Sequence, residues 1–287
     1  MKVQETAGRG ASQIARFPAG ASAKEASMRA LSCNGVLRTT DTDILLYFPR
    51  PMRSLSTAIW GGGFRNVRWA ANHKLTVFYP TEDAFPGGSV ASYLRLALLD
   101  AGCDPETSCA LLTSARLEWF RYCRKACGAL TVETIATGGV EKTAARAGEP
   151  AFYEEKDGHF LPVGTINLIT LVNGFLPDSI MARALITVTE GKAAALQDLG
   201  IASCATGRPA TGTATDGITL LTDPHGPCYT DAGTFSRLGE FLASSSYETV
   251  RGCLEDFDRP WNRDERLATP GAVSVSELRD RATRRRP

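Results

Sequence analysis

The sequence contains little histidine, no marked excess of either charge and no long apolar run. Only three of its 287 residues are His, and they lie far apart, at His73, His159 and His225. A three-His metal site would need all of them to converge, so we do not expect a metal centre of that kind. The 32 Lys and Arg nearly balance the 31 Asp and Glu. A formal net charge of +1 gives no long-range field to attract nucleic acid or an anionic membrane, which favours a small-molecule partner.

Apolar runs and cysteines bear on the location of the protein. No stretch of about eighteen apolar residues occurs, so we predict no membrane-spanning helix. The N-terminus lacks the apolar stretch of a secretory signal. The eight Cys are irregularly spaced, unlike the dense disulfide framework of a short secreted protein. We therefore expect a cytoplasmic protein with reduced thiols and no membrane or nucleic-acid partner, and the sequence leaves its oligomeric state open.

A chain of this length suits one large domain or two small ones. Residues 1–30 are rich in Ala, Ser, Gly and Arg, so we predict a disordered N-terminal tail. Residues 257–287 are rich in Arg and are predicted to form a flexible C-terminal tail, with a phosphate- or nucleic-acid-binding arm as the alternative. Residues 31–256 are expected to form one domain.

Apolar runs and helical periodicity predict a mixed domain between these tails. The predicted strands are Ile44–Phe48, Leu55–Trp60, Leu75–Tyr79, Cys109–Thr113, Leu130–Thr137, Ile166–Val172 and Gly217–Leu221. The predicted helices are Ser89–Ala101, Pro177–Leu199 and about Thr234–Leu254, with Ser89 as one N-cap and Thr234 or Asp231 as another. Strands and helices do not alternate strictly, so we expect a layered α+β domain with helices packed on mixed β-sheets rather than a doubly wound parallel sheet.

One candidate functional residue lies in the apolar strand predicted over Ile166–Val172. Asn167 interrupts that run, and a buried amide needs hydrogen-bond partners. It can hold a substrate carbonyl or oxyanion, or it can make a structural hydrogen bond at the strand edge. The sequence favours neither interpretation.

A second candidate lies on the long predicted helix. Its apolar stripe is formed by Met181, Leu185, Val188, Ala195 and Leu199. Lys192 follows Leu185 by seven residues and points along the same stripe. A Lys directed at the interior is costly unless it is paired or functional, and the alternative is that it reaches solvent near the last turns. Glu190 points to roughly the opposite face.

A third candidate is the segment Ala210–Gly217, which precedes a predicted strand. It combines flexible Gly with the hydroxyls of Thr211, Thr213 and Thr215 and the carboxylate of Asp216. Hydroxyls can act as donors, acceptors or nucleophiles, and such density is typical of a binding loop. The alternative is a turn in which Thr and Asp side chains bond the local backbone.

The order of these segments resembles that of the adenosylcobinamide amidohydrolase family. The resemblance extends over about residues 35–255. It is carried by Ser56–Ala58 before Gly62 and Gly63, Thr137–Val140, Ala144–Gly148, Gly164–Asn167, Thr189–Leu196, Thr211–Asp216, Leu238–Glu240 and Tyr247–Glu248. No single stretch is specific, but their succession is. A weaker resemblance of Gly164–Asp216 to ornithine acetyltransferases implies a sandwich of two sheets with helices outside, and Thr170 is the nearest position to their self-processing Thr.

The family resemblance implies hydrolysis of the amide that joins the aminopropanol arm to the corrin ring of adenosylcobinamide, which yields adenosylcobyric acid for cobalamin salvage. The cobalt belongs to the corrinoid substrate, so the resemblance implies no protein metal and no other cofactor. Four positions depart from the family pattern: Gly61 and Thr143 stand where Asn is expected, Glu149 where Asp is usual, and Gly191 where Ala is usual. The two missing Asn side chains motivate an alternative, a non-catalytic corrinoid-binding protein. A self-processing acyltransferase-like enzyme is the other alternative.

Residue chemistry and motif matching together assign roles to individual side chains. Thr213 or Thr215 is expected to position the substrate or attack it, and Asp216 to act as general base or to orient the attack. Lys192 with Asn167 is expected to stabilise the oxyanion. The alternates for acid–base chemistry are Glu190 and Glu240. The positions expected to bind substrate are Gly62, Gly63, Thr165, Arg146 and Glu240.

Overall fold

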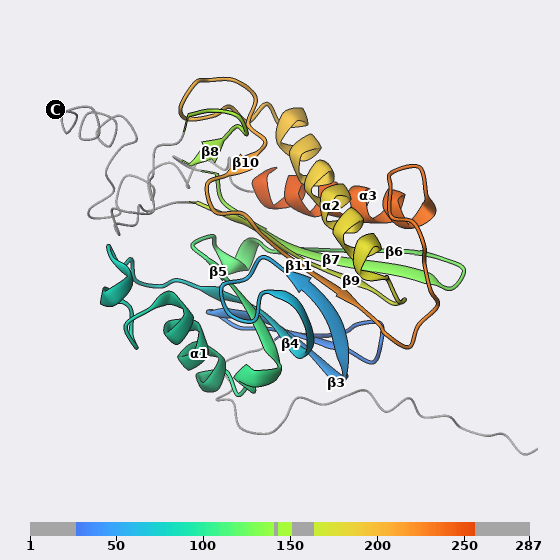
Figure 1. The fold of residues 1–287 in the computed structure, drawn as a ribbon. Helices are drawn as coiled ribbons and strands as arrows, with labels where there is room; N and C mark the ends of the chain where they lie inside the picture. The colour runs from blue at the N-terminus through green and yellow to red at the C-terminus, as the bar shows by residue number, and fades with distance from the viewer. Residues whose placement is uncertain (1–26, 141–142, 151–163, 256–287) are drawn as a thin grey trace, which may run out of the picture.

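The computed structural model describes residues 27–140, 143–150 and 164–255 (Figure 1). The predicted C-terminal tail and most of the predicted N-terminal tail lie outside these residues. The last four residues of the N-terminal segment, Ser27–Ala30, form strand β1.

The described residues contain short and long strands, three α-helices and three single-turn 3₁₀ helices. The strands are β1, β2 (Val36–Thr39), β3 (Asp43–Ser56), β4 (Gly63–Lys74), β5 (Ser108–Thr113), β6 (Arg121–Cys127), β7 (Leu130–Gly138), β8 (Ala144–Ala145), β9 (Ile166–Val172), β10 (Gly212–Thr213) and β11 (Gly217–Thr222). The α-helices are α1 (Val90–Asp100), α2 (Asp178–Asp198) and α3 (Arg237–Glu255), and the 3₁₀ helices are Glu82–Ala84, Pro105–Thr107 and Leu117–Trp119.

Strand β3 joins two layers of one large sheet. Its first half pairs with β2 and its last residues pair with β11, while β4 runs antiparallel along its other edge. The order across the sheet is β1-β2-β3-β11-β9-β7-β6, and β5 is added parallel to β4. The register between β3 and β4 shifts between Tyr47 and Met52, and such an irregularity bends a strand. The bend lets the β3–β4–β5 layer fold over the β11–β9–β7–β6 layer.

Side-chain alternation explains why both layers are buried. Along β9, Asn167, Ile169 and Leu171 face the other layer, whereas Ile166 and Leu168 face the helices, as expected for a strand with period two. The core between the layers combines Leu46 and Leu111 from one side with Ile135, Ile169 and Leu221 from the other. All seven residues of β9 are buried, which explains its unbroken apolar run.

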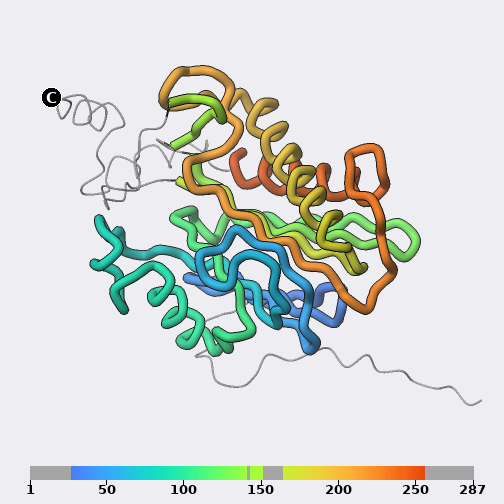
Figure 2. The backbone as a smooth tube through the Cα atoms, viewed as in Figure 1, coloured from blue at the N-terminus to red at the C-terminus, as the bar shows by residue number. Residues whose placement is uncertain are grey.

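Helices close the two outer faces (Figures 1 and 2). Helices α2 and α3 cover β7, β9 and β11 through a core that includes Val188, Leu242 and Val250. Helix α1 packs Leu94 and Leu98 against the outer face of β3, β4 and β5. The domain is therefore a layered α+β fold in the order helix, sheet, sheet, helix, as predicted.

The structure confirms most of the predicted elements in this part of the chain. The strands β5, β7, β9 and β11 and all three α-helices match their predicted segments to within a few residues. The side chain of Ser89 accepts a hydrogen bond from Ser92 N at 3.1 Å and caps α1, as predicted. Helix α3 begins differently: Ser236 Oγ, not Thr234 or Asp231, accepts from Gly239 N at 3.1 Å.

Two strand predictions were wrong, and six strands were missed, namely β1, β2, β4, β6, β8 and β10. Leu75–Tyr79 follows β4 as a loop in which Val77 and Phe78 are exposed, and β3 ends at Ser56 rather than continuing to Trp60. Strand β4 begins with four exposed residues, and β6 is a charged edge strand that pairs with β7 alone. Strand β6 and the first four residues of β4 lack the apolar runs by which strands are predicted.

None of the helices in residues 27–140, 143–150 and 164–255 carries an apolar stretch long enough to cross a bilayer. All eight cysteines fall within these residues and are free thiols. The thiols of Cys103, Cys109 and Cys253 are buried, and burial raises the pKa of each to about 12.

Candidate active site

Polar residues gather where the ends of five strands meet. Strands β9 and β11 run parallel and start at this edge, while β7, antiparallel to β9, ends there. The ends of β4 and β5 lie opposite, because Asn167 of β9 reaches the side chain of Asn72 on β4 and the backbone of Leu112 on β5. The segment Ala210–Gly217 crosses this edge before β11. Through Asp216 it contacts both the start of β9, at Ile166, and Lys192 of α2, so the three candidate segments of the sequence meet here.

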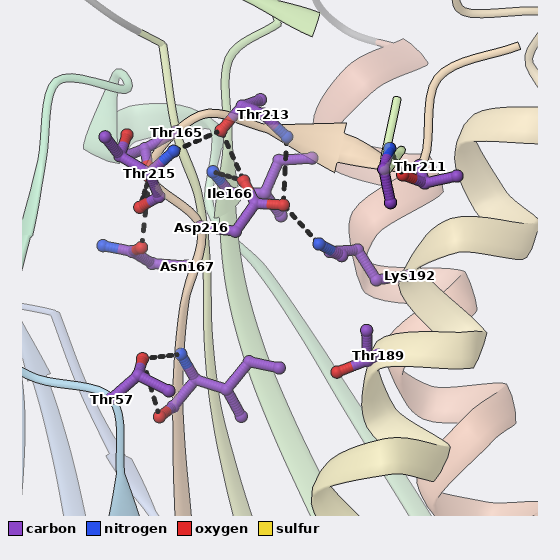
Figure 3. Close-up of polar contacts among 12 residues, drawn as sticks. Thr57, Thr165, Ile166, Asn167, Thr189, Lys192, Thr211, Thr213, Thr215 and Asp216 are labelled. Carbon is purple, nitrogen blue, oxygen red and sulfur yellow. Dashed lines mark hydrogen bonds and ion pairs between the residues drawn. The ribbon is translucent and has the colours of Figure 1, made fainter. Parts of the chain in front are cut away.

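Asp216 is the centre of this cluster (Figure 3). Its Oδ1 accepts hydrogen bonds from Ile166 N at 3.0 Å and from the Thr213 hydroxyl. Its Oδ2 accepts from Thr213 N at 3.1 Å and from the ammonium of Lys192. The carboxylate thus has four donors from three elements, and its side chain is only 12% exposed. Such bonding fixes the orientation of both oxygens.

Lys192 reaches Asp216 from the buried face of α2. Its side chain is 8% exposed, so it does not extend to solvent, which was the alternative left open by the sequence. A buried ammonium is costly unless an anion compensates it, and Asp216 supplies that anion. The other predicted carboxylate of this helix, Glu190, is exposed and does not join the cluster.

Two glycines allow this ion pair to form. A Cβ on Gly212 would lie 2.3 Å from Asp216 Oδ2 and 2.7 Å from Lys192 Nζ, so a side chain there would separate the pair. A Cβ on Gly191 would lie 2.4 Å from the carbonyl oxygen of Ala243 on α3. Because Gly191 lets α2 and α3 approach closely, it also fixes the depth at which the neighbouring Lys192 enters the site.

The two predicted threonines differ in partner and exposure. Thr213 is half-buried in β10, where it pairs with Ala144 of β8, and its hydroxyl donates to Asp216. Thr215 is exposed, and its hydroxyl donates to the carbonyl oxygen of Gly164 at 3.3 Å. The backbone N–H of Thr215 points to Thr213 Oγ1 at 3.5 Å. Only Thr213 therefore combines a carboxylate partner with partial access to solvent.

Asn167 belongs to a row of buried side chains between the two layers. Its Nδ2 donates to Asn72 Oδ1 at 2.8 Å and to the carbonyl oxygen of Leu112 at 2.9 Å. Asn72 in turn donates to Thr137 Oγ1 at 2.9 Å. Both amide hydrogens of Asn167 are thus in use, as in the structural interpretation of this residue. Asn72 was not predicted as a site residue, although a polar residue directly after the apolar run Trp69–Ala71 was a signal for it.

Thr165 and Thr143 fix the position of the chain at the start of β9. The hydroxyl of Thr165 donates to the carbonyl oxygen of Thr215 at 2.7 Å, which ties the start of β9 to the loop before β11. Thr143 Oγ1 accepts from Gly164 N at 2.9 Å. The residue that replaces the expected Asn at position 143 therefore has a definite structural partner.

The other predicted substrate-binding residues lie around the cluster rather than in it. Gly62 and Gly63 follow Thr57, whose backbone pairs with Ile218 of β11, so their loop runs beside the Asp216 end of that strand. Arg146 donates to the carbonyl oxygen of Pro209 at 2.8 Å. Glu240 is exposed on α3, where it pairs with Arg237 at 2.8 Å. None of these side chains has a described contact with Asp216.

Gly61, the other departure from the family pattern, has a steric explanation. Its φ angle is +68°, in the left-handed region, and a Cβ would lie 2.2 Å from the carbonyl oxygen of Ser108. Only glycine avoids that contact with this backbone. The missing Asn thus reflects how the loop packs on β5.

The described residues contain no group of three or more His, Cys, Asp or Glu side chains placed to hold a metal ion. The cluster instead offers a hydroxyl, a carboxylate and an ammonium in direct contact. These groups can move a proton and stabilise charge, which are the needs of acyl transfer.

Three solved structures are distantly similar to this chain. The PH0078 protein of Pyrococcus horikoshii OT3 has a TM-score of 0.40 and 12% identity, and the match covers 75% of this chain and 78% of that chain. A Burkholderia sp. β-aminopeptidase has a TM-score of 0.38 and 10% identity, with 76% of this chain and 79% of that chain covered. An L-aminopeptidase D-Ala-esterase/amidase from Ochrobactrum anthropi has a TM-score of 0.38 and 9% identity, with 90% of each chain covered. Similarity at this level does not allow residue roles to be transferred.

Sequence comparison is more informative. An uncharacterized protein of Methanocaldococcus jannaschii is 32% identical over 242 residues, which cover 79% of this chain and 90% of that protein. The family model described as adenosylcobinamide amidohydrolase matches residues 30–259, most of the chain and all of the candidate site. The chain therefore belongs to the adenosylcobinamide amidohydrolase family.

Proposed function

We propose that this protein hydrolyses the amide bond between the corrin side chain and the aminopropanol arm of adenosylcobinamide. The products are adenosylcobyric acid and the free amino alcohol, and the reaction serves cobalamin salvage. Membership of the family supports the substrate. The observation that carries the chemistry is the direct contact of the Thr213 hydroxyl and the Lys192 ammonium with the two oxygens of Asp216.

Amide hydrolysis needs an activated nucleophile, a stabilised tetrahedral oxyanion and a proton for the leaving amine. Asp216 Oδ1 faces a hydroxyl, so it can accept a proton at the start of the reaction and return it to the amine. Lys192 donates to the other oxygen, Oδ2, and holds the carboxylate in this orientation. This arrangement favours a role for Lys192 in holding the base, in addition to its predicted role in oxyanion stabilisation.

The proposed partner is a small corrinoid, and its cobalt is part of the substrate. We propose no protein-bound metal and no further cofactor, because a carboxylate and a hydroxyl suffice to move the protons. Dialysis of the purified protein against a chelator is expected to leave kcat unchanged. A loss of activity that added zinc or another divalent ion restores would contradict this part of the proposal.

The direct test is to incubate the pure protein with adenosylcobinamide and to follow cobyric acid by chromatography. We expect product with the wild-type protein and a loss of orders of magnitude in turnover for Asp216→Asn. Binding of adenosylcobinamide without product would favour the non-catalytic corrinoid-binding alternative. Unchanged turnover in Asp216→Asn would remove this residue from the mechanism.

The acyltransferase alternative makes a separate prediction, because self-processing at a Thr would cut the chain. Thr170, the nearest position to such a nucleophile, is fully buried in β9, and its hydroxyl lies 3.2 Å from that of Thr134. We expect a single full-length band on a denaturing gel after purification. Two fragments that meet at a Thr would favour self-processing instead.

A further inference from the structure

We propose that Thr213 is a covalent nucleophile that carries the corrinoid acyl group as an ester, and that the protein therefore also transfers this acyl group to small amines. The inference rests on the proposed function for its substrate. It identifies one threonine among several, and it predicts a second activity at the same site.

The hydroxyl partners of the site threonines single out Thr213. The Thr165 hydroxyl donates to the carbonyl oxygen of Thr215, and the Thr215 hydroxyl donates to that of Gly164. A backbone carbonyl does not take up a proton near neutral pH, so neither hydroxyl has a base. Thr211 Oγ1 accepts from Ala147 N at 2.9 Å, and no base contact of its own is described. Thr213 alone among these four donates to a carboxylate.

The surroundings of Thr213 suit a nucleophile. Thr213 is half-buried, so its hydroxyl is held in place but a substrate can still reach it. The backbone is fixed twice, by the pairing of β10 with β8 and by the bond from Thr213 N to Asp216 Oδ2 at 3.1 Å. Lys192 fixes the same carboxylate from the opposite side. A nucleophile and base held in this way meet the geometric requirement for activation of a hydroxyl.

A backbone donor lies beside the attacking atom. The N–H of Thr215 points to Thr213 Oγ1 at a distance of 3.5 Å, which is long for a hydrogen bond. When Oγ1 bonds to a carbonyl carbon, the oxyanion forms next to Oγ1, within reach of this N–H. A backbone donor that is fixed before the reaction stabilises such charge without reorganisation. The amide of Asn167, whose hydrogens are donated elsewhere, is not required for this step.

The chemistry balances without any further reactant. Thr213 Oγ1 attacks the carbonyl carbon of the amide, and its proton moves to Asp216 Oδ1. The C–N bond then breaks as Asp216 returns this proton to the leaving nitrogen, so the amino alcohol departs and an ester remains. Water gives a proton to Asp216, attacks the ester carbon and expels Oγ1, which recovers the proton. An amine that replaces water in this second half gives a new amide by the same proton path.

The first experiment uses hydroxylamine as the competing amine. The protein is incubated with adenosylcobinamide and rising hydroxylamine, and the products are resolved by mass spectrometry. We expect the hydroxamate of adenosylcobyric acid to increase as the free acid decreases, and acid-quenched protein to carry the corrinoid acyl mass on the peptide that contains Thr213. Hydrolysis with neither a hydroxamate nor a covalent adduct would overturn the inference and leave the proposed function intact.

Variants separate a nucleophile from a residue that only shapes the site. Thr213→Val is expected to lower kcat at least about a thousandfold and to abolish the adduct, whereas Thr213→Ser, which restores a hydroxyl, retains both. Thr189→Val is the matched control: its hydroxyl donates to Leu185 O on the exposed side of α2, and activity should not change. A Thr213→Val protein that keeps its melting temperature and its turnover would overturn the inference.

A second experiment does not depend on the corrinoid. A small β-lactone, which acylates activated hydroxyls, is added to the full chain, and the modified residues are located by peptide mass spectrometry. We expect an ester on Thr213 in the wild-type protein and none at this position in Asp216→Asn. If the lactone labels Thr213 but adenosylcobinamide is not hydrolysed, the substrate of the proposed function is wrong and the nucleophile is right. Absence of label on Thr213 in a protein that hydrolyses adenosylcobinamide contradicts the inference.

Discussion

Two carboxylates with little exposure to solvent, those of Asp216 and Glu133, lie at opposite ends of the same sheet layer. Asp216 precedes β11, at the edge where β9 begins. Glu133 lies near the start of β7, opposite Leu171 at the far end of β9. Each accepts several hydrogen bonds from segments distant in the sequence. Asp216 is the one for which we propose a catalytic role, and the two carboxylates differ in their partners.

Glu133 is sealed from solvent. It is 1% exposed and accepts from Ser32 N at 2.8 Å, from the Ser32 hydroxyl and from the Tyr122 hydroxyl. Burial of the phenol, with the hydrogen bond to Glu133, raises the pKa of Tyr122 above its usual range. The described donors of this carboxylate are neutral. Glu133 thus holds the β1–β2 connection on the sheet through the hydroxyls of two half-buried residues, Ser32 and Tyr122.

Asp216 differs in its partner. The buried ammonium of Lys192 compensates its charge, whereas the described donors of Glu133 are neutral. The hydroxyl of a half-buried residue donates to each carboxylate, Thr213 to Asp216 and Tyr122 to Glu133. Burial and hydrogen bonding to hydroxyls are therefore shared by the two carboxylates, and the paired lysine separates them.

The largest expected loss of stability and turnover follows from breaking the ion pair of Lys192 and Asp216. Asp216→Asn leaves the Lys192 ammonium buried without its anion, so we expect a loss of about 3–5 kcal/mol in the free energy of unfolding, together with the loss of turnover. The double variant Lys192→Met/Asp216→Asn removes both charges and should regain stability but not activity. Urea unfolding and turnover measured on the same samples test this. Recovery of turnover in the double variant would show that Asp216 is not the base.

The second largest effect is expected from variants in the hydrogen-bonded row of Asn167, Asn72 and Thr137 between the two layers. Asn167→Ala leaves Asn72 Oδ1 and the Leu112 carbonyl without their donor, at a cost of about 1–3 kcal/mol for each unsatisfied group. We expect the melting temperature to fall while kcat changes little, because both hydrogens of Asn167 are already donated. A fall of about 10²–10³-fold in kcat at an unchanged melting temperature would instead support the predicted oxyanion role. Thr137→Val, which removes the other end of the row, is the comparison for stability.

The sealed carboxylate should affect stability alone. Glu133→Gln replaces one acceptor oxygen by an NH₂ group that faces the donors of Ser32 and Tyr122, so we expect a loss of about 1–3 kcal/mol. Turnover of adenosylcobinamide should stay at the wild-type value. A kcat that falls with the variant still folded would show that the two carboxylates are coupled, and would break the distinction drawn between them.

The smallest effect is expected at the exposed pair of Glu240 and Arg237. An ion pair on the surface contributes about 0–1 kcal/mol, so Glu240→Gln should leave both stability and kcat unchanged. The variant is also a control for Asp216→Asn, since both exchange a carboxylate for an amide. A rise in KM at constant kcat would support the substrate-binding role predicted for Glu240.

Much of the fold followed from apolar patterning. The unbroken apolar run of Ile166–Val172 predicted β9, and the stripe through Met181 and Val188 predicted α2, because in both cases the buried face is a local property of the sequence. Strand β4 was missed because its buried apolar residues are confined to its second half, after four exposed residues. Strand β6 was missed because it is stabilised by pairing with β7 rather than by an apolar run of its own. The segment Leu75–Tyr79 is apolar but forms a loop rather than the predicted strand, and its side chains remain partly exposed.

The sequence by itself determined the family, the layered α+β class and the residue types of the site, including a lysine on the apolar face of a helix. Only the tertiary structure decided what each of these residues touches. Lys192 contacts Asp216, which lies 24 residues away in the sequence, and Asn167 contacts Asn72, which lies 95 residues away. Contacts of this kind depend on how closely helices and sheet layers approach, here through glycines such as Gly191 and Gly212. Local patterns fix which face of an element is buried, but the packing of distant elements decides which buried groups meet.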